Sequence, residues 1–331
     1  MKQIEGGVTA SKGFQAAGVE AGVKYQNRKD MALVYSTAHC VAAGTFTTNV
    51  VKAAPVLWDK KIVDTAPFVQ AVVVNSGVAN ACTGKQGMDI CEEEAKCAGN
   101  LLEIPAEAVL VASSGVIGMQ LPMDRINAGI EKLVAAKSDT LEAGLEAAKA
   151  IMTTDTVYKQ IAVEMEIGGK IVTLGGMSKG SGMIHPNMCT MLGFLTTDLA
   201  IDKSLLQEAL SLVVKDTFNM ITVDGDTSTN DSLLILANGM AENEAITVKG
   251  EDYQTFVDAL FYVCEFLAKK MAADGEGATK LFEAKVVNAK SKEDARTLSR
   301  AIVASNLSKA AIYGCDANFG RFLCAMGYSG A

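Results

Sequence analysis

The chain has 331 residues, a formal net charge of −8, 49% hydrophobic residues and 21% charged residues. This composition is that of an ordinary globular protein, and the length favours about two domains. Lysine and arginine are scattered along the chain, whereas nucleic-acid-binding proteins rely on clustered cations that displace counterions. The sequence contains no basic helix suited to an anionic membrane surface and no run of ~18 apolar residues. We therefore expect a small-molecule substrate, with neither a nucleic-acid nor a membrane partner.

The cysteines and histidines form no metal-binding pattern. There are eight cysteines and two histidines, and no two cysteines have the C-x-x-C spacing. A chain of this length can bury an adequate core without disulfides, so we expect reduced thiols, no metal and a cytoplasmic protein. The first residues also lack the apolar run of a signal peptide.

The N-terminal part of the chain predicts short strands separated by turns. Phe68 to Val74 and Ala108 to Ala112 have the composition of buried strands. Each runs into a turn signal, Asn75 to Gly77 and Ser113 to Gly115. Between them, Cys91 to Leu102 predicts a helix with three glutamates in its first turn, where the helix dipole favours acids.

The rest of the chain predicts alternating helices and strands from caps, periodicity and turn residues. In chain order these are a helix from Asp139 to about Thr153, a hairpin from Ile161 to Thr173, a glycine-rich loop from Gly175 to Cys189, an apolar strand from Thr190 to Leu195, helices from Asp202 to about Met220 and from Tyr253 to Met271, a strand from Phe282 to Val287 and a helix from Lys292 to Ser305. This mixture indicates a layered α+β architecture.

Several familiar site patterns are absent or incomplete. His39 lies in an apolar stretch and is expected to be a buried structural residue, whereas His185 either tunes a nearby site or is a bystander. The glycines and lysine of Gly175 to Gly180 stand in the wrong order for a phosphate loop, and Gly275 to Gly277 lacks a third glycine. Asp224 to Ser228 resembles a calcium loop but lacks its glycine and its bidentate acid.

The segment Lys179 to Leu192 (KGSGMIHPNMCTML) offers a different chemistry. If the loop strains one peptide bond, the Thr190 hydroxyl can attack the carbonyl of Cys189, and hydrolysis of the resulting ester cuts the chain. The freed α-amine of Thr190 has a reference pKa near ~8, so it can accept the proton of its own hydroxyl. The same residues also fit a tight turn before a core strand, and the segment alone leaves both readings open.

Lys179 to Ile201 (KGSGMIHPNMCTMLGFLTTDLAI) resembles the self-cleavage segment of the ornithine acetyltransferase family, the bifunctional glutamate N-acetyltransferases of arginine biosynthesis. The likeness extends along nearly the whole chain. The other blocks that carry it, in family order, are Gly6 to Lys24 (GGVTASKGFQAAGVEAGVK), Asn75 to Gly87 (NSGVANACTGKQG), Val111 to Gly118 (VASSGVIG), Ile151 to Thr156 (IMTTDT), Asp274 to Lys280 (DGEGATK) and Gly327 to Gly330 (GYSG).

The resemblance implies a set of catalytic residues. Thr190 would be the nucleophile, and the bond between Cys189 and Thr190 would be the cleavage point. The hydroxyl of Ser114 and the backbone N–H of Gly115 would form the oxyanion hole. Family members commonly have alanine where this chain has Cys189 and threonine where it has Ser114. Cysteine is small and serine keeps the hydroxyl, so we expect both functions to be retained.

Three further positions, Thr153, Lys179 and Glu276, match substrate-binding positions of the family, and Thr190 is a fourth. A lysine suits the carboxylate of an acetylated amino acid, and a glutamate suits the amine of ornithine. By themselves the first three residues also fit ordinary roles, as a helix C-terminal residue, a solvated loop cation and a turn acid.

The resemblance further implies the fold, the reaction and the assembly. We expect a helix/sheet/sheet/helix catalytic domain over residues 1–280 and a smaller C-terminal α/β unit over residues 281–331. The unit is expected to be incomplete, because family members continue beyond the position of Ala331. Acetyl transfer from N-acetylornithine to glutamate would need no cofactor, with acetyl-CoA as a possible co-substrate. Fragments 1–189 and 190–331 would pair and form a heterotetramer with two of each.

Two other functions remain open from the sequence. A self-processing aminopeptidase or amidase of related architecture would pass the acyl group to water instead of to glutamate. A truncated and inactive relative would act only in binding or assembly, and it would stay uncleaved.

Overall fold

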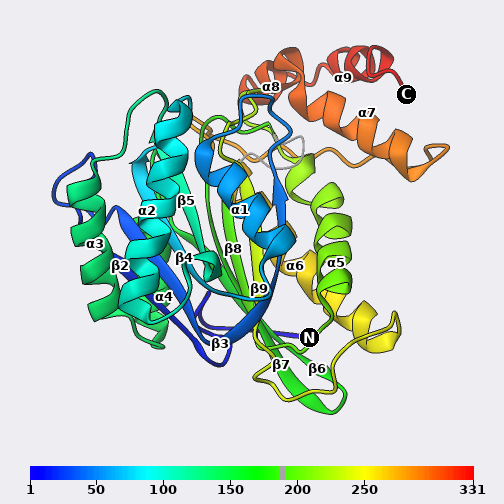
Figure 1. Ribbon diagram of the computed structural model, residues 1–331. Helices are drawn as coiled ribbons and strands as arrows, with labels where there is room; N and C mark the ends of the chain where they lie inside the picture. Colours follow the sequence, from blue (N-terminus) through cyan, green and yellow to red (C-terminus); the bar gives the residue numbers. More distant parts are fainter. Residues whose placement is uncertain (186–190) are drawn as a thin grey trace.

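The computed structural model describes residues 1–185 and 191–331, and its centre is a strand that is shared by two sheets (Figure 1). The strand order is β1-β6-β7-β8-β9-β3-β4-β5, with β2 paired to β3. The first part of β3 (Met31–Phe46) pairs with β2 (Phe14–Val19) and β4 (Val69–Val78), and its last part pairs with β9 (Ser232–Ala237). The register shifts between Tyr35 and Cys40, where β3 passes from one sheet to the other.

The remaining strands and helices complete the two sheets and the layers that cover them. The other strands are β1 (Lys2–Ile4), β5 (Val109–Val116), β6 (Lys159–Ile167), β7 (Lys170–Lys179) and β8 (Leu192–Thr197). The helices are α1 (Ala54–Thr65), α2 (Gly84–Leu102), α3 (Met123–Ala136), α4 (Leu141–Ala150), α5 (Lys203–Asp216), α6 (Glu251–Ala273), α7 (Lys292–Ala304), α8 (Asn306–Tyr313) and α9 (Phe319–Gly327), with short 3₁₀ turns at Ala106–Ala108 and Phe218–Met220.

Strands β8 and β9 lie between two hydrophobic cores, and their side chains point alternately into one core and the other. Phe194 and Leu236 belong to the core between the sheets, which also contains residues of β4 and β5. Leu195 and Ile235 belong to the core under α5 and α6. Because β8 and β9 are parallel and buried on both faces, their apolar residues are contiguous and do not alternate with polar ones: Phe194 and Leu195 in β8, and Leu233 to Ala237 in β9.

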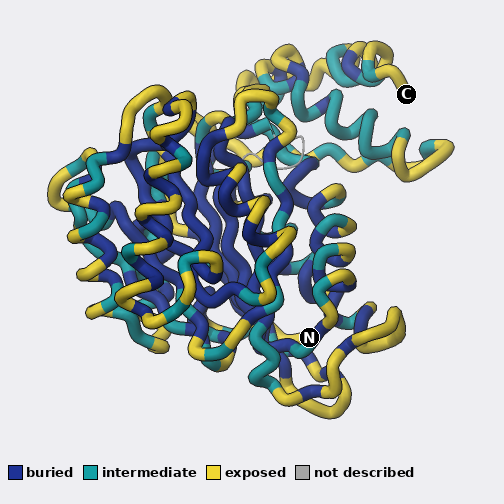
Figure 2. Tube along the Cα trace, viewed as in Figure 1, coloured by how far each residue is buried: buried dark blue, intermediate teal, exposed yellow. Residues whose placement is uncertain are grey.

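The layers follow the expected helix/sheet/sheet/helix order. Helices α5 and α6 pack on the sheet that contains β3, β6 and β7, and α1 to α4 pack on β2, β3 and β5. The buried strands form the interior, and exposed residues lie mainly on the outer faces of the helices and on the loops (Figure 2). Among the described residues, no helix has the length and hydropathy needed to cross a bilayer.

Several predicted elements are confirmed with adjusted ends. Asp202 caps α5 by accepting a hydrogen bond from the Ser204 backbone N–H. The helix predicted from Tyr253 to Met271 is α6, and its apolar residues at helical spacing are buried: Phe256, Leu260, Val263 and Leu267. The cap of α4 is Thr140, one residue after the predicted Asp139, and this helix ends at Ala150. Helix α2 begins at Gly84, so the three glutamates lie in its middle.

Two predicted segments in the second half of the chain have a different structure. The strand predicted over Phe282 to Val287 is absent: half-buried and exposed residues alternate there, but none of the described strands pairs with this segment. The loop predicted from Gly175 belongs to β7 as far as Lys179. A Cβ at Gly175 would lie 2.0 Å from the carbonyl oxygen of Gly7, so this glycine permits close packing instead of making a turn. In Figure 1 the C-terminal part is made of α7, α8 and α9.

Two carboxyl groups are buried between α1, α2 and β5. Asp59 is 1% exposed and Glu94 is 2% exposed. Asp59 Oδ1 accepts a hydrogen bond of 2.8 Å from the Val111 backbone N–H, but Asp59 Oδ2 and Glu94 Oε2 have no partner among the described residues. Burial raises the pKa of Glu94 to about 8 and the pKa of Asp59 well above its usual value. Glu94 is therefore predominantly protonated in the folded protein at neutral pH.

We predict that the folded protein becomes less stable in mild base, because Glu94 then loses this proton. The pKa of Glu94 is raised in the folded state, so its stabilising contribution is lost as the pH rises from 4.5 to about 8. The loss is on the order of a few kcal/mol, and Glu94→Gln should remove it. Urea unfolding at about pH 6 and about pH 8 should show a flatter pH dependence for this variant. The exposed neighbour Glu92, changed to Gln, should keep the slope of the wild type, and an unchanged slope in Glu94→Gln would contradict the prediction.

Candidate active site

A cavity of about 420 Å³ lies where the ends of the two sheets meet. This volume is in the range of small-molecule sites. Its lining includes all the predicted site residues that the structure describes, which are Ser114, Gly115, Thr153, Lys179 and Glu276. Cys189 and Thr190, the predicted cleavage pair, lie outside the described residues. Met191 and Leu192, which follow them directly, line this same cavity.

One wall of the cavity is made by the parallel ends of β4 and β5. The turns predicted at Asn75 to Gly77 and at Ser113 to Gly115 are wrong, because both segments belong to these strands. Their residues pair, with Ser76 opposite Ser114 and Gly77 opposite Gly115. Gly115 has φ +136°, and a Cβ at this position would lie 2.2 Å from the carbonyl carbon of Gly77. Only glycine fits such a position, so the close approach of the two strand ends places the Gly115 backbone at the cavity wall.

Lys179 crosses from the end of β7 to this wall. Its Nζ donates a hydrogen bond of 3.0 Å to Ser114 Oγ, and each of the two residues is 9% exposed. Burial lowers the pKa of Lys179, whereas the charges of Asp155 and Asp231 act in the opposite direction. The predicted alternative of a solvated loop cation is therefore wrong for this lysine.

A buried ion network lies next to the cavity-lining residues Thr153 and Lys179 in the chain. Lys159 Nζ lies 2.7 Å from Asp155 Oδ1 and 2.7 Å from Asp274 Oδ2, and the three side chains are 0 to 5% exposed. Asp155 also accepts hydrogen bonds from the backbone N–H groups of Gly180 and Thr153. The network thus fixes the loop after α4 and the end of β7 to the end of α6.

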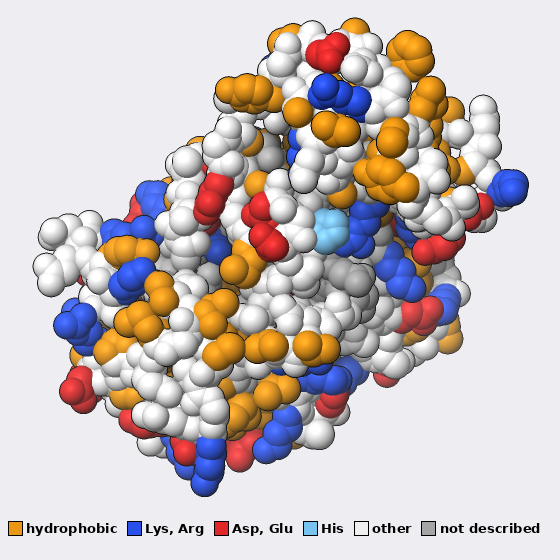
Figure 3. All heavy atoms as spheres, turned by 90° about the horizontal axis from the view of Figure 1, so that it is seen from above, with side chains coloured by type: hydrophobic (Ala, Val, Ile, Leu, Met, Phe, Trp, Pro, Cys, Tyr) orange, Lys and Arg blue, Asp and Glu red, His pale blue; other side chains and the backbone are white. Residues whose placement is uncertain are grey.

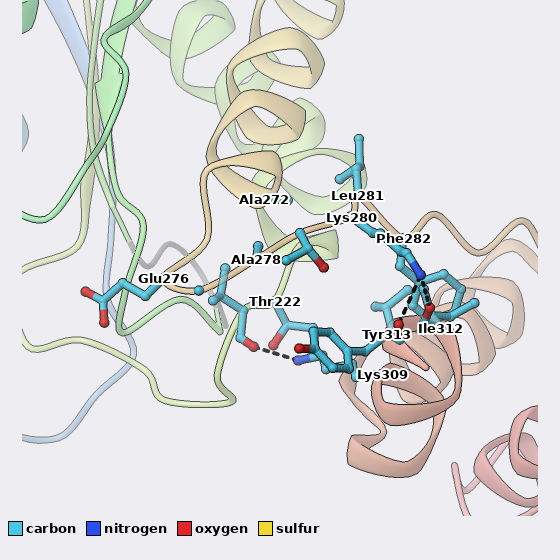
Figure 4. Close-up of a pocket in the computed structure, with 14 residues that line it drawn as sticks. Thr222, Ala272, Glu276, Ala278, Lys280, Leu281, Phe282, Lys309, Ile312 and Tyr313 are labelled. Carbon is cyan, nitrogen blue, oxygen red and sulfur yellow. Dashed lines mark hydrogen bonds between the residues drawn. The ribbon is translucent and has the colours of Figure 1, made fainter. Parts of the chain in front are cut away.

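Glu276 follows this network and faces the cavity. Its backbone N–H donates a hydrogen bond of 2.8 Å to the carbonyl of Ser181. A Cβ at Gly182 would lie 2.3 Å from Glu276 Oε1, so the loop passes directly over the carboxylate. A second cavity of about 210 Å³ shares Glu276, but the side chain points away from the other residues that line it (Figure 4). The carboxylate therefore serves the first cavity.

The segment rejected as a calcium loop clamps the chain before the undescribed residues. The Asp224 carboxylate accepts hydrogen bonds from the backbone N–H groups of Met183 (2.6 Å) and Ile184 (2.9 Å). Thr227 Oγ1 donates a hydrogen bond of 2.8 Å to the carbonyl of His185. Residues 1–185 and 191–331 contain no cluster of three or more potential metal-ligating side chains.

The two histidines differ from each other in their surroundings. His185 Nδ1 lies 2.9 Å from Thr222 Oγ1, and burial lowers the pKa of the imidazole. His39 is exposed and stacks on Phe68 with the ring centroids 3.7 Å apart, so the prediction of a buried structural histidine is wrong. It lies where the pairing of β3 with β4 shifts register, and this irregularity breaks the alternation on which the prediction depended.

Sequence reasoning missed two residues that complete the cavity. Asn230 donates hydrogen bonds of 2.5 Å and 2.9 Å to the carbonyls of Ala79 and Ser113, and it thereby ties the start of β9 to β5. Asp231 follows it and lies close enough to Lys179 to affect its pKa. The only sequence signal for these two residues was the polar run before an apolar strand.

On the face shown in Figure 3, acidic and basic side chains are interspersed without a large patch of one sign.

Comparisons with known proteins give consistent matches. The model of the ArgJ family matches residues 15–331. The arginine biosynthesis bifunctional protein ArgJ of Symbiobacterium thermophilum is 56% identical over 333 residues, which is 100% of this chain and 82% of that protein. The crystal structure of the arginine biosynthesis bifunctional protein ArgJ from Bacillus halodurans matches with a TM-score of 0.54 and 43% identity, over 56% of this chain and 96% of that chain. Ornithine acetyltransferase of Mycobacterium tuberculosis, complexed with ornithine, matches with a TM-score of 0.51 and 44% identity, over 55% of this chain and 95% of that chain.

We predict that Gly115→Ala disrupts the cavity wall. The new Cβ would collide with the Gly77 backbone, which cannot move without breaking the β4–β5 pairing. The expected loss is on the order of 3 kcal/mol of unfolding free energy, measured by urea denaturation. Gly118→Ala is the matched control, because Gly118 also has positive φ (+84°) but nothing lies within 4 Å of its Cβ position. It should cost only about 1 kcal/mol, and equal losses in the two variants would contradict the collision.

Proposed function

The chain belongs to the ArgJ family, and from that membership we propose that it moves an acetyl group from N-acetylornithine to glutamate through an acetyl-Thr190 intermediate. Membership makes the chain an acyltransferase of arginine biosynthesis. The identity of the two substrates and the roles of the individual residues are parts of the proposal.

One observation carries the proposal. Five residues from four separate blocks of the sequence line a single cavity, and the chain re-enters the described structure in the lining of that cavity at Met191. Thr190 is the residue that directly precedes Met191 in the chain. A set of donors, a cation and a carboxylate around one small cavity is what acyl transfer between amino acids requires.

The chemistry has two balanced half-reactions. In the first, the Thr190 oxygen bonds to the acetyl carbon, its proton passes to the Thr190 α-amine, and the carbonyl electron pair moves to the acetyl oxygen. Ser114 and Gly115 stabilise that oxyanion by hydrogen bonds. Collapse breaks the C–N bond, and ornithine leaves with the proton from the α-amine. In the second, the glutamate amine attacks the ester, and the same groups act in reverse.

In the proposed mechanism, self-cleavage after Cys189 frees the α-amine of Thr190. Fragments 1–189 and 190–331 would remain associated, because β8 from the second fragment pairs along its whole length with β7 from the first. The alignments with the two solved ArgJ-family chains include 96% and 95% of those chains, but only 56% and 55% of this chain. They are therefore about as long as fragment 1–189, which supports cleavage. We further propose a heterotetramer with two copies of each fragment.

The proposed steps use no metal or organic cofactor. We further propose acetyl-CoA as an alternative acetyl donor. The cysteines that the structure describes are all free thiols, and this supports a reducing compartment, which we take to be the cytoplasm.

Replacement of the nucleophile tests the proposal. Thr190→Ala should give a single uncleaved band on a denaturing gel and no transfer of acetyl from N-acetylornithine to glutamate. Thr190→Ser keeps a hydroxyl and should retain both reactions. In the wild type, N-terminal sequencing of the smaller fragment should read Thr-Met-Leu-Gly-Phe. An uncleaved wild-type chain, or an active Thr190→Ala variant, would contradict the proposal, and release of free acetate in place of acetylglutamate would indicate an amidase.

Glu276 should distinguish the two half-reactions. If its carboxylate binds the side-chain amine of ornithine, Glu276→Gln should raise the KM for N-acetylornithine by about 10- to 100-fold, the usual effect of losing a charged hydrogen bond. The KM for glutamate, which has no such amine, should change much less. The matched control is Glu166→Gln, an exposed position on β6. An equal rise in the KM values for N-acetylornithine and glutamate would refute the assigned role.

A further inference from the structure

The proposed reaction brings two side chains of opposite charge into one cavity. N-acetylornithine ends in an amine that is protonated at neutral pH, whereas glutamate ends in a second carboxylate. Glu276 lines the cavity and suits the ammonium group, but its carboxylate would repel the side chain of glutamate. Binding of glutamate therefore calls for a further cation in the lining, one that is not already used by the α-carboxylate common to both substrates.

Among the residues that the structure describes, the cations that line the cavity are Lys24 and Lys179. Lys179 is 9% exposed and donates a hydrogen bond to Ser114, so it suits the α-carboxylate, which lies two bonds from the acetylated nitrogen. Lys24 is exposed. Neither Lys24 nor Glu276 forms an ion pair with a described residue. Both charges are thus available to substrate groups of the opposite sign.

A clamped loop holds the backbone of Lys24 at the cavity wall. The Asp30 side chain is fully buried, and its carboxylate accepts hydrogen bonds of 2.6 to 3.3 Å from the backbone N–H groups of residues 21–23. A Cβ at Gly77 would lie 2.8 Å from the Cβ of Lys24. The first part of the lysine side chain therefore packs against the end of β4, beside the strand that carries the proposed oxyanion hole.

The ring of Tyr25 holds the ammonium group at the open side of the cavity. Lys24 Nζ lies 5.0 Å from the ring centroid and donates a long hydrogen bond of 3.5 Å to Tyr25 Oη. The Arg28 guanidinium lies 5.0 Å from the same centroid and donates hydrogen bonds to the carbonyls of Met152 and Thr153. An ammonium group has three donors, so most of the hydrogen-bonding capacity of Lys24 remains for a ligand.

We infer that Lys24 is a specificity-determining residue that binds the side-chain carboxylate of glutamate and of the N-acetylglutamate product. The inference rests on the proposed acetyl transfer. Lys179 then binds the α-carboxylate that both substrates share, Glu276 binds the side-chain ammonium of ornithine, and Lys24 binds the side chain of glutamate. Two opposite charges on separate loops allow one cavity to accept both side chains.

Removal of the charge tests this role, and kcat/KM for each substrate reports its own half-reaction in a ping-pong scheme. Lys24→Met should lower kcat/KM for glutamate by about tenfold, the lower end of the effect of losing a charged hydrogen bond, because the lysine is exposed. The value for N-acetylornithine should stay nearly unchanged. Lys24→Arg keeps a cation and should retain most of the activity toward glutamate. The matched control is Lys170→Met, an exposed lysine at the other end of β7 from the cavity.

Glutamine as the acceptor gives a readout that a merely structural role would not move. Its side chain has nearly the shape of the glutamate side chain but no charge, and its reacting amine is the same. The wild type should prefer glutamate over glutamine by about tenfold or more in kcat/KM, and Lys24→Met should remove most of this preference. A residue that only supports the fold would slow transfer to both acceptors equally. Should Lys24→Met fail to fold, Lys24→Gln allows the same comparison.

Two results would overturn the inference. One is a folded Lys24→Met variant that keeps the preference of the wild type for glutamate over glutamine. The other is an equal fall in kcat/KM for N-acetylornithine and glutamate, because Lys24 would then act on a group that the two substrates share. Failure of the proposed function would look different: the wild type itself would transfer no acetyl from N-acetylornithine to glutamate or to glutamine.

Discussion

The buried ion network of Lys159, Asp155 and Asp274 is the constraint on which the rest of the site depends. Removing one member of such a network leaves an uncompensated buried charge, at a typical cost of ~3–5 kcal/mol. The network holds three segments that are distant in sequence: the loop after α4, the end of β7 and the end of α6. Its carboxylates also accept backbone hydrogen bonds from Thr153, Gly180 and Thr156, so the main chain around the cavity is fixed as well.

The cavity is built on this support, where the ends of strands from the two sheets meet. The ends of β4 and β5 contribute the Gly115 backbone and the Ser114 hydroxyl, and the end of β7 contributes the Lys179 ammonium that bonds to that hydroxyl. The Asp224 clamp fixes residues Met183 and Ile184 on the approach to the cleavage pair. Groups held in this way need no reorganisation when negative charge develops on a reacting carbonyl, which is the main source of catalysis in acyl transfer.

The sequence predicted those parts of the fold that depend on local patterns. The Asp202 cap, the hairpin of β6 and β7 and the inward face of α6 follow from residues a few positions apart. The turns predicted at Asn75 to Gly77 and at Ser113 to Gly115 are instead the ends of β4 and β5, because the pairing that extends these strands depends on tertiary structure. The bond between Lys159 and Asp274 joins positions 115 residues apart, and no local pattern contains it. The site residues were predictable only from the family resemblance, whereas Asn230 and Asp231 were hidden in a polar run without a recognised motif.

The central claim is that Thr190 carries the acetyl group between the two substrates. Mass spectrometry of the wild-type protein mixed with N-acetylornithine in the absence of glutamate tests it most directly. The account predicts one acetyl adduct on the N-terminal residue of fragment 190–331, held as an ester on its hydroxyl and lost when glutamate is added. Efficient transfer to glutamate without any adduct on this fragment, or an adduct that glutamate cannot remove, would contradict it.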